Sequence, residues 1–241
     1  MNGPPGSAGR AVLRPAARAP NEDRSGVDAL IENFPAFVDG FLMTLRLLVV
    51  SGLGALALGT VIATLRISPV GALRGFATVY TEVVRNTPLT LVLFFCAFVL
   101  PQLGTRLEYP VAATIGLMVY TSPFVAEALR SGINGVPVGQ AEAARAIGLG
   151  FGQTVGLVVM PQAVRSVIPP LMNVLIALTK NTSVAAGFSV LELVAVSRQV
   201  VQNNGNATIA ILVAVAAFYL FITVPLGQAA NYLEKRLAVK R

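Results

Sequence analysis

Residues 142–161 read EAARAIGLGFGQTVGLVVMP, a polar, glycine-punctuated stretch between two long apolar runs. Its first residues, rich in Ala, Glu and Arg, favour a helix. Gly148 follows where such a helix would end in a C-terminal cap. A short helix with charged Glu142 and Arg145 and small Ala143 and Ala144 can sit closely in the groove of a partner. We therefore expect this stretch to be a contact surface for another protein.

The composition of the whole chain indicates a membrane protein. Of 241 residues, 55% are hydrophobic and 12% are charged, and the mean hydropathy is +0.72. These values lie outside the balance of soluble domains. Because a helical span needs roughly 20 apolar residues, the chain has room for about five or six spans and for no second soluble domain.

Several kinds of chemistry are disfavoured by the residue inventory. The chain has one cysteine, Cys96, inside an apolar run, and no histidine, so a disulfide framework and the usual transition-metal sites are not expected. None of the three lysines follows a glycine, as the lysine of a phosphate-binding Walker A loop would. We predict no catalytic residue, no metal site and no bound cofactor in this chain.

Hydropathy divides the chain into a tail, a surface segment and a transmembrane domain. Residues 1–26 are predicted to be a disordered tail, and 27–39 an amphipathic segment on the membrane surface. The transmembrane domain is predicted to be residues 40–241, with a cytoplasmic loop at about 131–165. The predicted spans are 40–66, 87–103, 109–129, 166–188 and 207–227. Residues 68–88, between the first two spans, are typical of a partly embedded broken helix.

The distribution of Lys and Arg predicts the orientation, because short loops rich in these residues stay cytoplasmic. Most of the basic residues, including the C-terminal ones, fall on the side of the 131–165 loop. We expect the C-terminus to be cytoplasmic and, with five spans, the N-terminus to be external. The net charge of +7 then faces anionic lipid, and no nucleic acid is needed to explain it.

The segment around residue 85 is the first candidate for the substrate path. Thr87 and Pro88 resemble a helix start, with a capping side chain followed by proline. If drawn into the membrane, this N-terminus and Arg85 would face an anionic substrate. The alternative is an interfacial cap with Glu82 and Arg85 paired on one helix face.

A second candidate lies inside the fourth predicted span, where a lysine and three hydrogen-bonding residues are costly unless they face a cavity or partner. These residues are Lys180, Asn181, Thr182 and Ser183. Glu127, beside a possible kink at Pro123, is the nearest candidate counter-charge to Lys180. The alternative is a purely structural ion pair between two spans.

The chain resembles the permease subunits of ABC importers. Glu142, Ala143, Ala144, Gly148 and Pro161 match the spacing of their EAA loop, which seats the ATPase. Val158 and Met160 depart from it. The motifs RNTPLTLV, YTSPFVAEALRSGI and ALTKNTS are similar to those of the polar amino-acid uptake family, and within it to glutamate permeases of actinobacteria.

The resemblance implies an all-α type I importer fold with five core helices and alternating access in the bacterial plasma membrane. It places ATPase coupling on Glu142, Ala143, Ala144 and Gly148, and implies two ATPase subunits that bind ATP and Mg²⁺, a second permease, and an extracytoplasmic amino-acid-binding protein. The substrate would be glutamate or a related polar amino acid. The alternatives are a self-contained channel or secondary transporter, and a structural subunit whose EAA-like helix is accidental.

Overall fold

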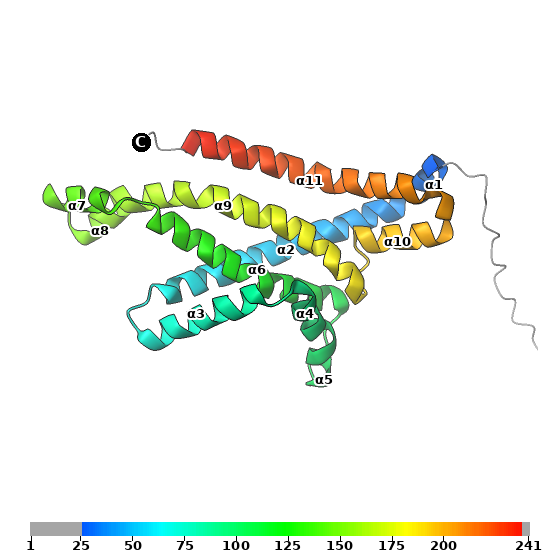
Figure 1. Ribbon diagram of the computed structural model, residues 1–241, viewed down its shortest axis with the longest axis horizontal. Coiled ribbons are helices and arrows are strands. Elements are labelled where there is room, and N and C mark those ends of the chain that lie inside the picture. The colour runs from blue at the N-terminus through cyan, green and yellow to red at the C-terminus, as the bar shows by residue number, and fades with distance from the viewer. Residues whose placement is uncertain (1–25, 238–241) are drawn as a thin grey trace, which may run out of the picture.

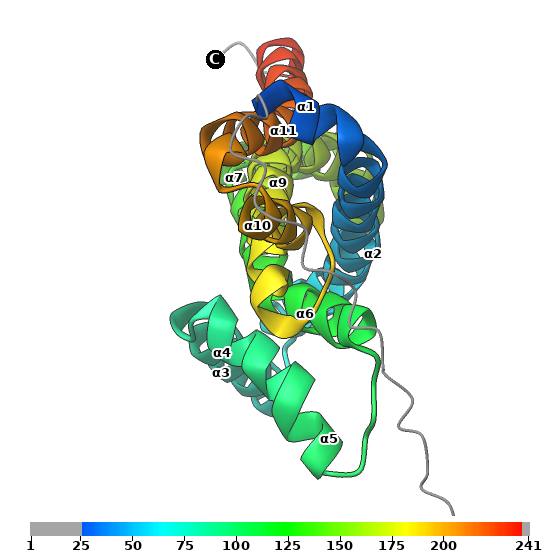
Figure 2. The ribbon, with the colours of Figure 1, turned by 90° about the vertical axis from the view of Figure 1, so that its right-hand side faces the viewer.

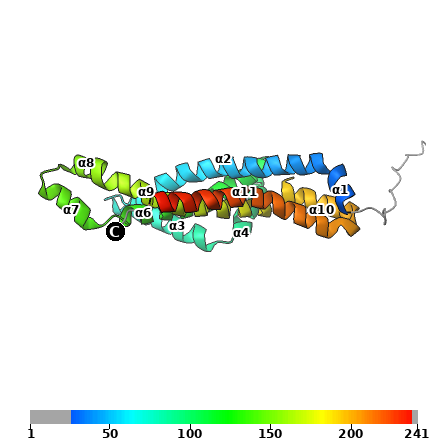
Figure 3. The ribbon, with the colours of Figure 1, turned by 90° about the horizontal axis from the view of Figure 1, so that it is seen from above.

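The computed structural model describes residues 26–237, and within that range all regular elements are helices. The long helices run roughly along the longest axis of an elongated molecule (Figures 1 and 3). The α-helices are α1 (Gly26–Glu32), α2 (Phe34–Arg66), α3 (Gly71–Asn86), α4 (Leu89–Phe94), α5 (Leu100–Gln102), α6 (Tyr109–Asn134), α7 (Val138–Ala146), α8 (Phe151–Gln153), α9 (Met160–Asn181), α10 (Leu193–Asn203) and α11 (Thr208–Leu237). The π-helices η1 (Phe95–Val99) and η2 (Thr154–Val159) and the 3₁₀-helices η3 (Thr182–Phe188) and η4 (Gly205–Ala207) join them.

Within residues 26–237, four helical stretches are long and apolar enough to cross a bilayer: Phe34–Arg66, Tyr109–Asn134, Phe151–Phe188 and Gly205–Arg236. A fifth candidate is the pair Gly71–Asn86 and Leu89–Gln102, which is bent by 104° between its halves. Counted as one span, this bent pair makes five, as predicted, but it includes α3, which lies outside the predicted second span 87–103. Its bend falls at Thr87 and Pro88, within the segment that the sequence indicates as a broken helix.

The N-terminal boundary differs from the prediction. Gly26 begins α1, and 34–39, predicted as part of a surface segment, belong to the spanning helix α2. The reason is Pro35, which lies in the first turn of α2, where proline costs no hydrogen bond and starts a helix rather than ending one. The predicted tail before Gly26 lies outside the described residues.

Helices α2 and α6 form the most extensive pair in the structure. Small residues bring them close: a Cβ at Gly59 would lie 2.7 Å from the Ser122 carbonyl oxygen and 2.6 Å from the Val125 side chain. Packing of this kind is what drives helix association in lipid, where burial against other helices gains little over burial in lipid tails.

A small apolar cluster packs α3 against α2 and α6, and two larger clusters fix the other helices. One joins α2, α4, α6, α9 and η3 near the middle of the molecule. The other joins α1, α2, α10 and α11 at one end, the end that faces the viewer in Figure 2. Helices α3, α4 and α5 lie to one side of the remaining helices (Figure 2). The helix α7 and the end of α11 lie toward the opposite end of the long axis (Figure 1).

Candidate functional site

The helix α7 carries the EAA residues at one extremity of the molecule (Figures 1 and 3). It ends in a Schellman motif, because the Gly148 N–H donates to the Arg145 carbonyl at 3.0 Å and the Leu149 N–H donates to the Ala144 carbonyl at 3.1 Å. Gly148 has a φ of +91°, which glycine adopts without strain. The predicted C-terminal cap at Gly148 is present.

The surface around α7 combines exposed polar and apolar groups. Glu142 and Ala143 are exposed, whereas Ala144 is buried within the chain, so only one of the two small residues is free for a partner. Just after the helix, the side chains of Ile147 and Phe151 are 80% and 81% exposed. Together with the charged Glu142 and Arg145, these side chains give the end of the molecule an exposed surface of mixed polarity.

The loop itself is shorter than the predicted 131–165. Helix α6 continues to Asn134, and α9 begins at Met160 rather than near residue 166. Both helices therefore run past their apolar segments toward α7. Sequence hydropathy marks where the apolar segments end, but hydrogen-bonded helices continue beyond that point in water as well.

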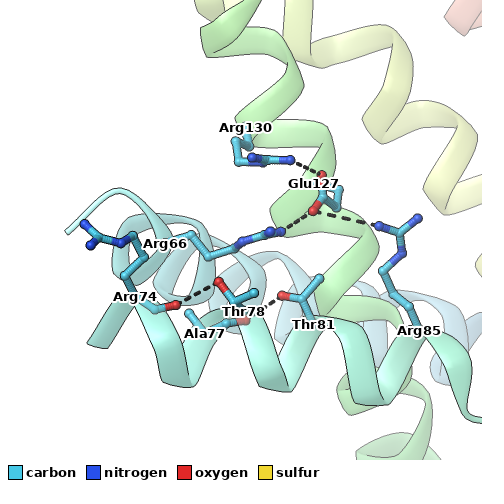
Figure 4. A network of polar contacts seen from close by, with 8 residues as sticks. All are labelled: Arg66, Arg74, Ala77, Thr78, Thr81, Arg85, Glu127 and Arg130. Carbon is cyan, nitrogen blue, oxygen red and sulfur yellow. Dashed lines mark hydrogen bonds and ion pairs between the residues drawn. The ribbon is translucent and has the colours of Figure 1, made fainter. Parts of the chain in front are cut away.

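A cluster of three arginines surrounds one carboxylate where α2, α3 and α6 meet (Figure 4). Arg66 forms an ion pair with Glu127 Oε1. Arg130 lies 3.2 Å from Oε2, and Arg85 lies 3.8 Å from Oε1. The side chains of Arg66 and Glu127 are 10% and 25% exposed, against 44% for Arg85. Arg85 is therefore the outermost and the most loosely held of the three.

The cluster corrects two predicted pairings. Glu127 pairs with arginines of α2, α3 and its own helix rather than with Lys180, and Arg85 turns toward Glu127 rather than toward Glu82. Arg66 is the partner that the sequence does not indicate, because it is 61 positions from Glu127 and lies at the end of a span, where basic residues are common. The packing of α2 and α3 against α6 brings Arg66 and Arg85 to Glu127, whereas Arg130 lies one turn further along α6 itself.

A cavity of about 410 Å³ lies next to this cluster, between α6 and α9. Its polar lining residues are Tyr120, Thr121, Asn173 and Asn181, and its apolar ones include Phe124. The Arg85 guanidinium lies 5.5 Å from the centre of the Phe124 ring. Because a cation over a ring face is attracted to it, Arg85 is held between Glu127 and a wall of the cavity.

Thr121 is an unusual member of the lining. Its hydroxyl oxygen is buried and has no hydrogen-bond partner among the described residues, and the residue is 4% exposed. A buried hydroxyl without a partner is costly. Thr121 is among the residues that line the cavity, so this hydroxyl lies at the cavity wall. Thr121 and Asn173 were not predicted as site residues, although a threonine and an asparagine inside apolar spans are a usable signal.

The structure separates the residues of the 180–183 stretch. Asn181 lines the cavity, whereas Lys180 is exposed. The Thr182 hydroxyl donates to the Thr179 carbonyl at 2.7 Å and the Ser183 hydroxyl to the Lys180 carbonyl at 2.7 Å. Asn181 is thus the one residue of this stretch that lines the cavity.

The predicted cap at Thr87 is wrong. Its hydroxyl donates back to the Val83 carbonyl of α3 at 2.8 Å, and α4 begins at Leu89 without a side-chain cap. The sharp bend explains this. Thr87 is the C-cap residue of α3, so its side chain turns back to α3, and the chain changes direction at Pro88.

Comparison with known proteins extends over nearly the whole described chain. Residues 55–239 match the family model described as "Binding-protein-dependent transport system inner membrane component". The glutamate transport system permease protein GluC of Corynebacterium glutamicum is 44% identical over 219 residues, which cover 86% of this chain and 96% of that protein. The probable glutamine ABC transporter permease protein GlnM of Bacillus subtilis is 40% identical over 211 residues, covering 88% and 97%.

A solved structure has the same fold. The chain is similar to one from a crystal structure of an amino acid ABC transporter with histidines, with a TM-score of 0.81 and 27% identity over 88% of this chain and 99% of that one. The predicted type I importer fold is confirmed.

Proposed function

Since this chain belongs to the family of binding-protein-dependent transport system inner membrane components, we propose that it forms the translocation path of an ATP-driven importer for glutamate or a related polar amino acid. The substrate class is supported by the names of the relatives, which are glutamate and glutamine permeases. It is supported independently by the chemistry of the cavity between α6 and α9.

The cavity beside Arg85 is the observation that carries the proposal. Three arginines against one carboxylate leave an excess of positive charge at its edge, which favours an anionic group. Arg85, as the loosest of the three, would bind a substrate carboxylate in a bidentate manner. Thr121, Asn173 and Asn181 would supply hydrogen bonds to the rest of a small polar molecule.

The remaining predicted path residues take smaller parts in this proposal. Thr87 makes the bend that ends α3 next to Arg85. Thr182 and Ser183 hold the end of α9 through bonds to backbone carbonyls. Lys180, which is exposed, would face a second permease or the path between two permeases.

We propose that α7 receives the ATPase. Glu142, Ala143, Ala144 and Gly148 define and terminate this helix, and the exposed Ile147 and Phe151 give it an apolar contact surface. ATP and Mg²⁺ would be bound by the ATPase subunits. A second permease, identical or a sister chain, would complete the path, and an amino-acid-binding protein would dock at the opposite end.

The geometry suggests how motion at α7 would reach the cavity. Helix α7 follows α6 directly and packs against η2, which continues into α9. The two helices that line the cavity are therefore the two that flank α7. A rigid-body displacement of α7 by closing ATPases would tilt α6 against α9 and change access to the cavity. In this scheme α7 is cytoplasmic, and α1, at the other end of the molecule, lies on the external side.

The experiment is labelled glutamate uptake in cells lacking this chain, complemented with wild type, Glu142→Lys or Glu234→Lys. Glu234 is exposed near the end of α11 and controls for a reversed charge at the same end. We expect Glu142→Lys alone to lose both uptake and the ATPase in a pull-down. Equal uptake with both variants would instead favour a channel or secondary transporter. No uptake with wild type would exclude glutamate and direct the test to other polar amino acids.

A further inference from the structure

Glu192 is a buried carboxyl group outside the cavity and the arginine cluster. It lies between η3 and α10, at the end of the molecule opposite α7, and it is 0% exposed. Within an apolar protein a carboxyl group in such a place needs partners for both oxygens. Its partners come from three different elements.

The two carboxyl oxygens have separate roles. Oε1 accepts the Ala195 N–H at 2.9 Å and thereby caps α10. Oε2 lies 3.0 Å from the Tyr219 hydroxyl of α11 and 3.5 Å from the Thr44 hydroxyl of α2. None of the ion pairs within residues 26–237 involves Glu192. The group therefore acts through hydrogen bonds and has no cation to balance a charge.

The same region brings α10 into close contact with α2. The Leu193 N–H donates to the Thr44 hydroxyl at 3.3 Å. A Cβ at Gly40 would lie 3.1 Å from the Leu193 Cα and 2.9 Å from a Val196 methyl group. Only glycine at position 40 permits this approach, so the first turn of α10 is fixed against α2 at backbone distance.

Segment 182–192 connects this anchor to the cavity. It begins next to Asn181, which lines the cavity, and it ends at Glu192, whose carboxyl group is bonded to α2 and α11. Between these two points, Ser189 has a φ of +58°, a conformation that residues other than glycine rarely adopt. The segment thus links the anchored carboxyl group to the cavity.

The surroundings of Glu192 change the pKa of its carboxyl group. Burial raises the pKa of its carboxyl group, against the lowering effect of its hydrogen bonds. The groups facing it are hydroxyls of α2 and α11 and the backbone of α10, and each hydroxyl can accept a proton as well as donate one. An uncharged carboxyl is therefore fully accommodated.

We propose that Glu192 is a positioning residue for translocation: its carboxyl group, bonded to Tyr219, Thr44 and the start of α10, fixes segment 182–192 and so holds Asn181 beside the cavity. The inference rests on the proposed importer function for its link to transport. The positioning itself is a property of the chain that can be measured without transport.

The test uses a buried cysteine as a reporter of segment movement. Val190 is fully buried two residues before Glu192, and Val190→Cys fits there because cysteine is smaller and packs as a small hydrophobe. The reporter is placed in a Cys96→Ala background, which removes the only native cysteine. Labelling by a membrane-impermeant maleimide in sonicated membranes then measures how often the segment opens. The same substitutions at Glu192, Tyr219 and Tyr232 are also made in the native chain, without Val190→Cys and Cys96→Ala. There the native Cys96, which is buried in η1, reports opening of a different part of the structure.

We expect Tyr219→Phe to speed labelling of position 190 by roughly three- to tenfold, as loss of one buried hydrogen bond implies. Glu192→Ala removes the bonds to Ala195, Tyr219 and Thr44 and should speed labelling at least as much. Glu192→Gln, whose amide can both accept and donate hydrogen bonds at the same place, should stay within about twofold of wild type. Tyr232→Phe, on the same helix α11 but exposed, should change nothing. Labelling of Cys96 should be unchanged in all four, and glutamate uptake should fall with the first two variants only.

Three results would overturn the proposal: unchanged labelling of position 190 in Glu192→Ala, equal labelling in Glu192→Gln and Glu192→Ala, or equal acceleration at Cys96. The second would mean that the charge of Glu192 matters, and the third that the residue supports overall stability. If wild type shows no uptake of any amino acid, the importer function fails, while the labelling still decides whether Glu192 positions the segment.

Discussion

Arg66 and Glu127 connect the last residue of α2 to the C-terminal third of α6 through an ion pair in which both side chains are at least three-quarters buried. The pair also gathers Arg85 and Arg130 around the same carboxylate. One side chain thus holds α2, α3 and α6 together next to the cavity. Replacing Glu127 should therefore lower both the stability of the protein and its transport activity.

Glu127→Gln should therefore lower stability by about 1–3 kcal/mol, because it leaves the buried Arg66 without its counter-charge. Arg85 loses its restraint as well, so glutamate uptake should fall at least about tenfold at equal protein level. Thermal unfolding in detergent and uptake in cells measure the two effects. Glu82→Gln, on exposed α3, is the control, and an equal effect of both substitutions would contradict the role of the cluster.

Gly148→Ala should damage α7 by forcing a side chain into a φ of +91°, at a cost of about 1–2 kcal/mol. The C-terminal cap would be displaced, and we expect weaker retention of the ATPase in a pull-down. Gly139→Ala is the matched control, since its Cβ would meet nothing within 4 Å. If the two variants retain the ATPase equally, the cap does not shape the docking surface.

Thr121→Val should separate ligand binding from stability. The substitution removes a buried hydroxyl that has no partner among the described residues, so stability should stay constant or rise by about 1 kcal/mol. Uptake should nevertheless show a raised KM, by roughly tenfold, for loss of one hydrogen bond to the substrate. Thr114→Val, whose hydroxyl bonds a carbonyl of its own helix, should leave the KM unchanged. A normal KM in Thr121→Val would remove Thr121 from the path.

Gly59→Ala tests the close contact of α2 and α6. The added methyl group would lie 2.7 Å from a backbone oxygen, and such overpacking costs about 1–3 kcal/mol. Gly75→Ala lies in α3 with open space around it and should be neutral or slightly stabilising. Thermal unfolding of the two variants in the same detergent measures the difference, and equal midpoints would mean that the helices can separate without loss.

Glu192 should make stability depend on pH. Because burial raises its pKa in the folded protein, the folded state retains the proton after the unfolded chain has lost it. Its favourable contribution is complete below the unfolded value of about 4.3 and is lost as the pH rises through the raised folded value. Glu192→Gln should flatten this part of the stability profile, measured by thermal unfolding across the pH range. A profile that keeps its slope would assign the dependence to other groups.

Much of the fold could be predicted because lipid imposes simple rules on sequence. Apolar runs mark spans, and the spacing from Glu142 to Gly148 marks a capped helix, since both depend on neighbouring residues. Partners across the fold are a different matter. Several basic residues could lie near Glu127, depending on how the helices pack, and the packing is not known from the sequence. The residues next to Arg66 and Lys180 in the sequence do not show which of the two is its partner.

The cavity and the Glu192 anchor show the same limit. In the sequence, Thr121 resembles any small polar residue that a span can accommodate. Only the structure shows that its buried hydroxyl has no partner among the described residues. In the sequence VLELVAVS, Glu192 looks like an acidic residue of a loop. Its position just before an amphipathic helix is nevertheless a recognisable signal of a helix N-cap. What decides their roles is burial, which depends on residues far away in the chain.

The bend between α3 and α4 affects how the protein is made. With 16 residues, α3 is about 24 Å long, shorter than the roughly 30 Å of a hydrocarbon core, and α4 to α5 is shorter still. Neither half can enter the bilayer alone as a complete span during synthesis. We expect residues 71–102 to insert together as one bent span. The backbone polar groups at the bend near Pro88 need α6 beside them, because they cannot be left unpaired in lipid. We therefore expect insertion of this span to be complete only once α6, which is translated after it, has entered the bilayer.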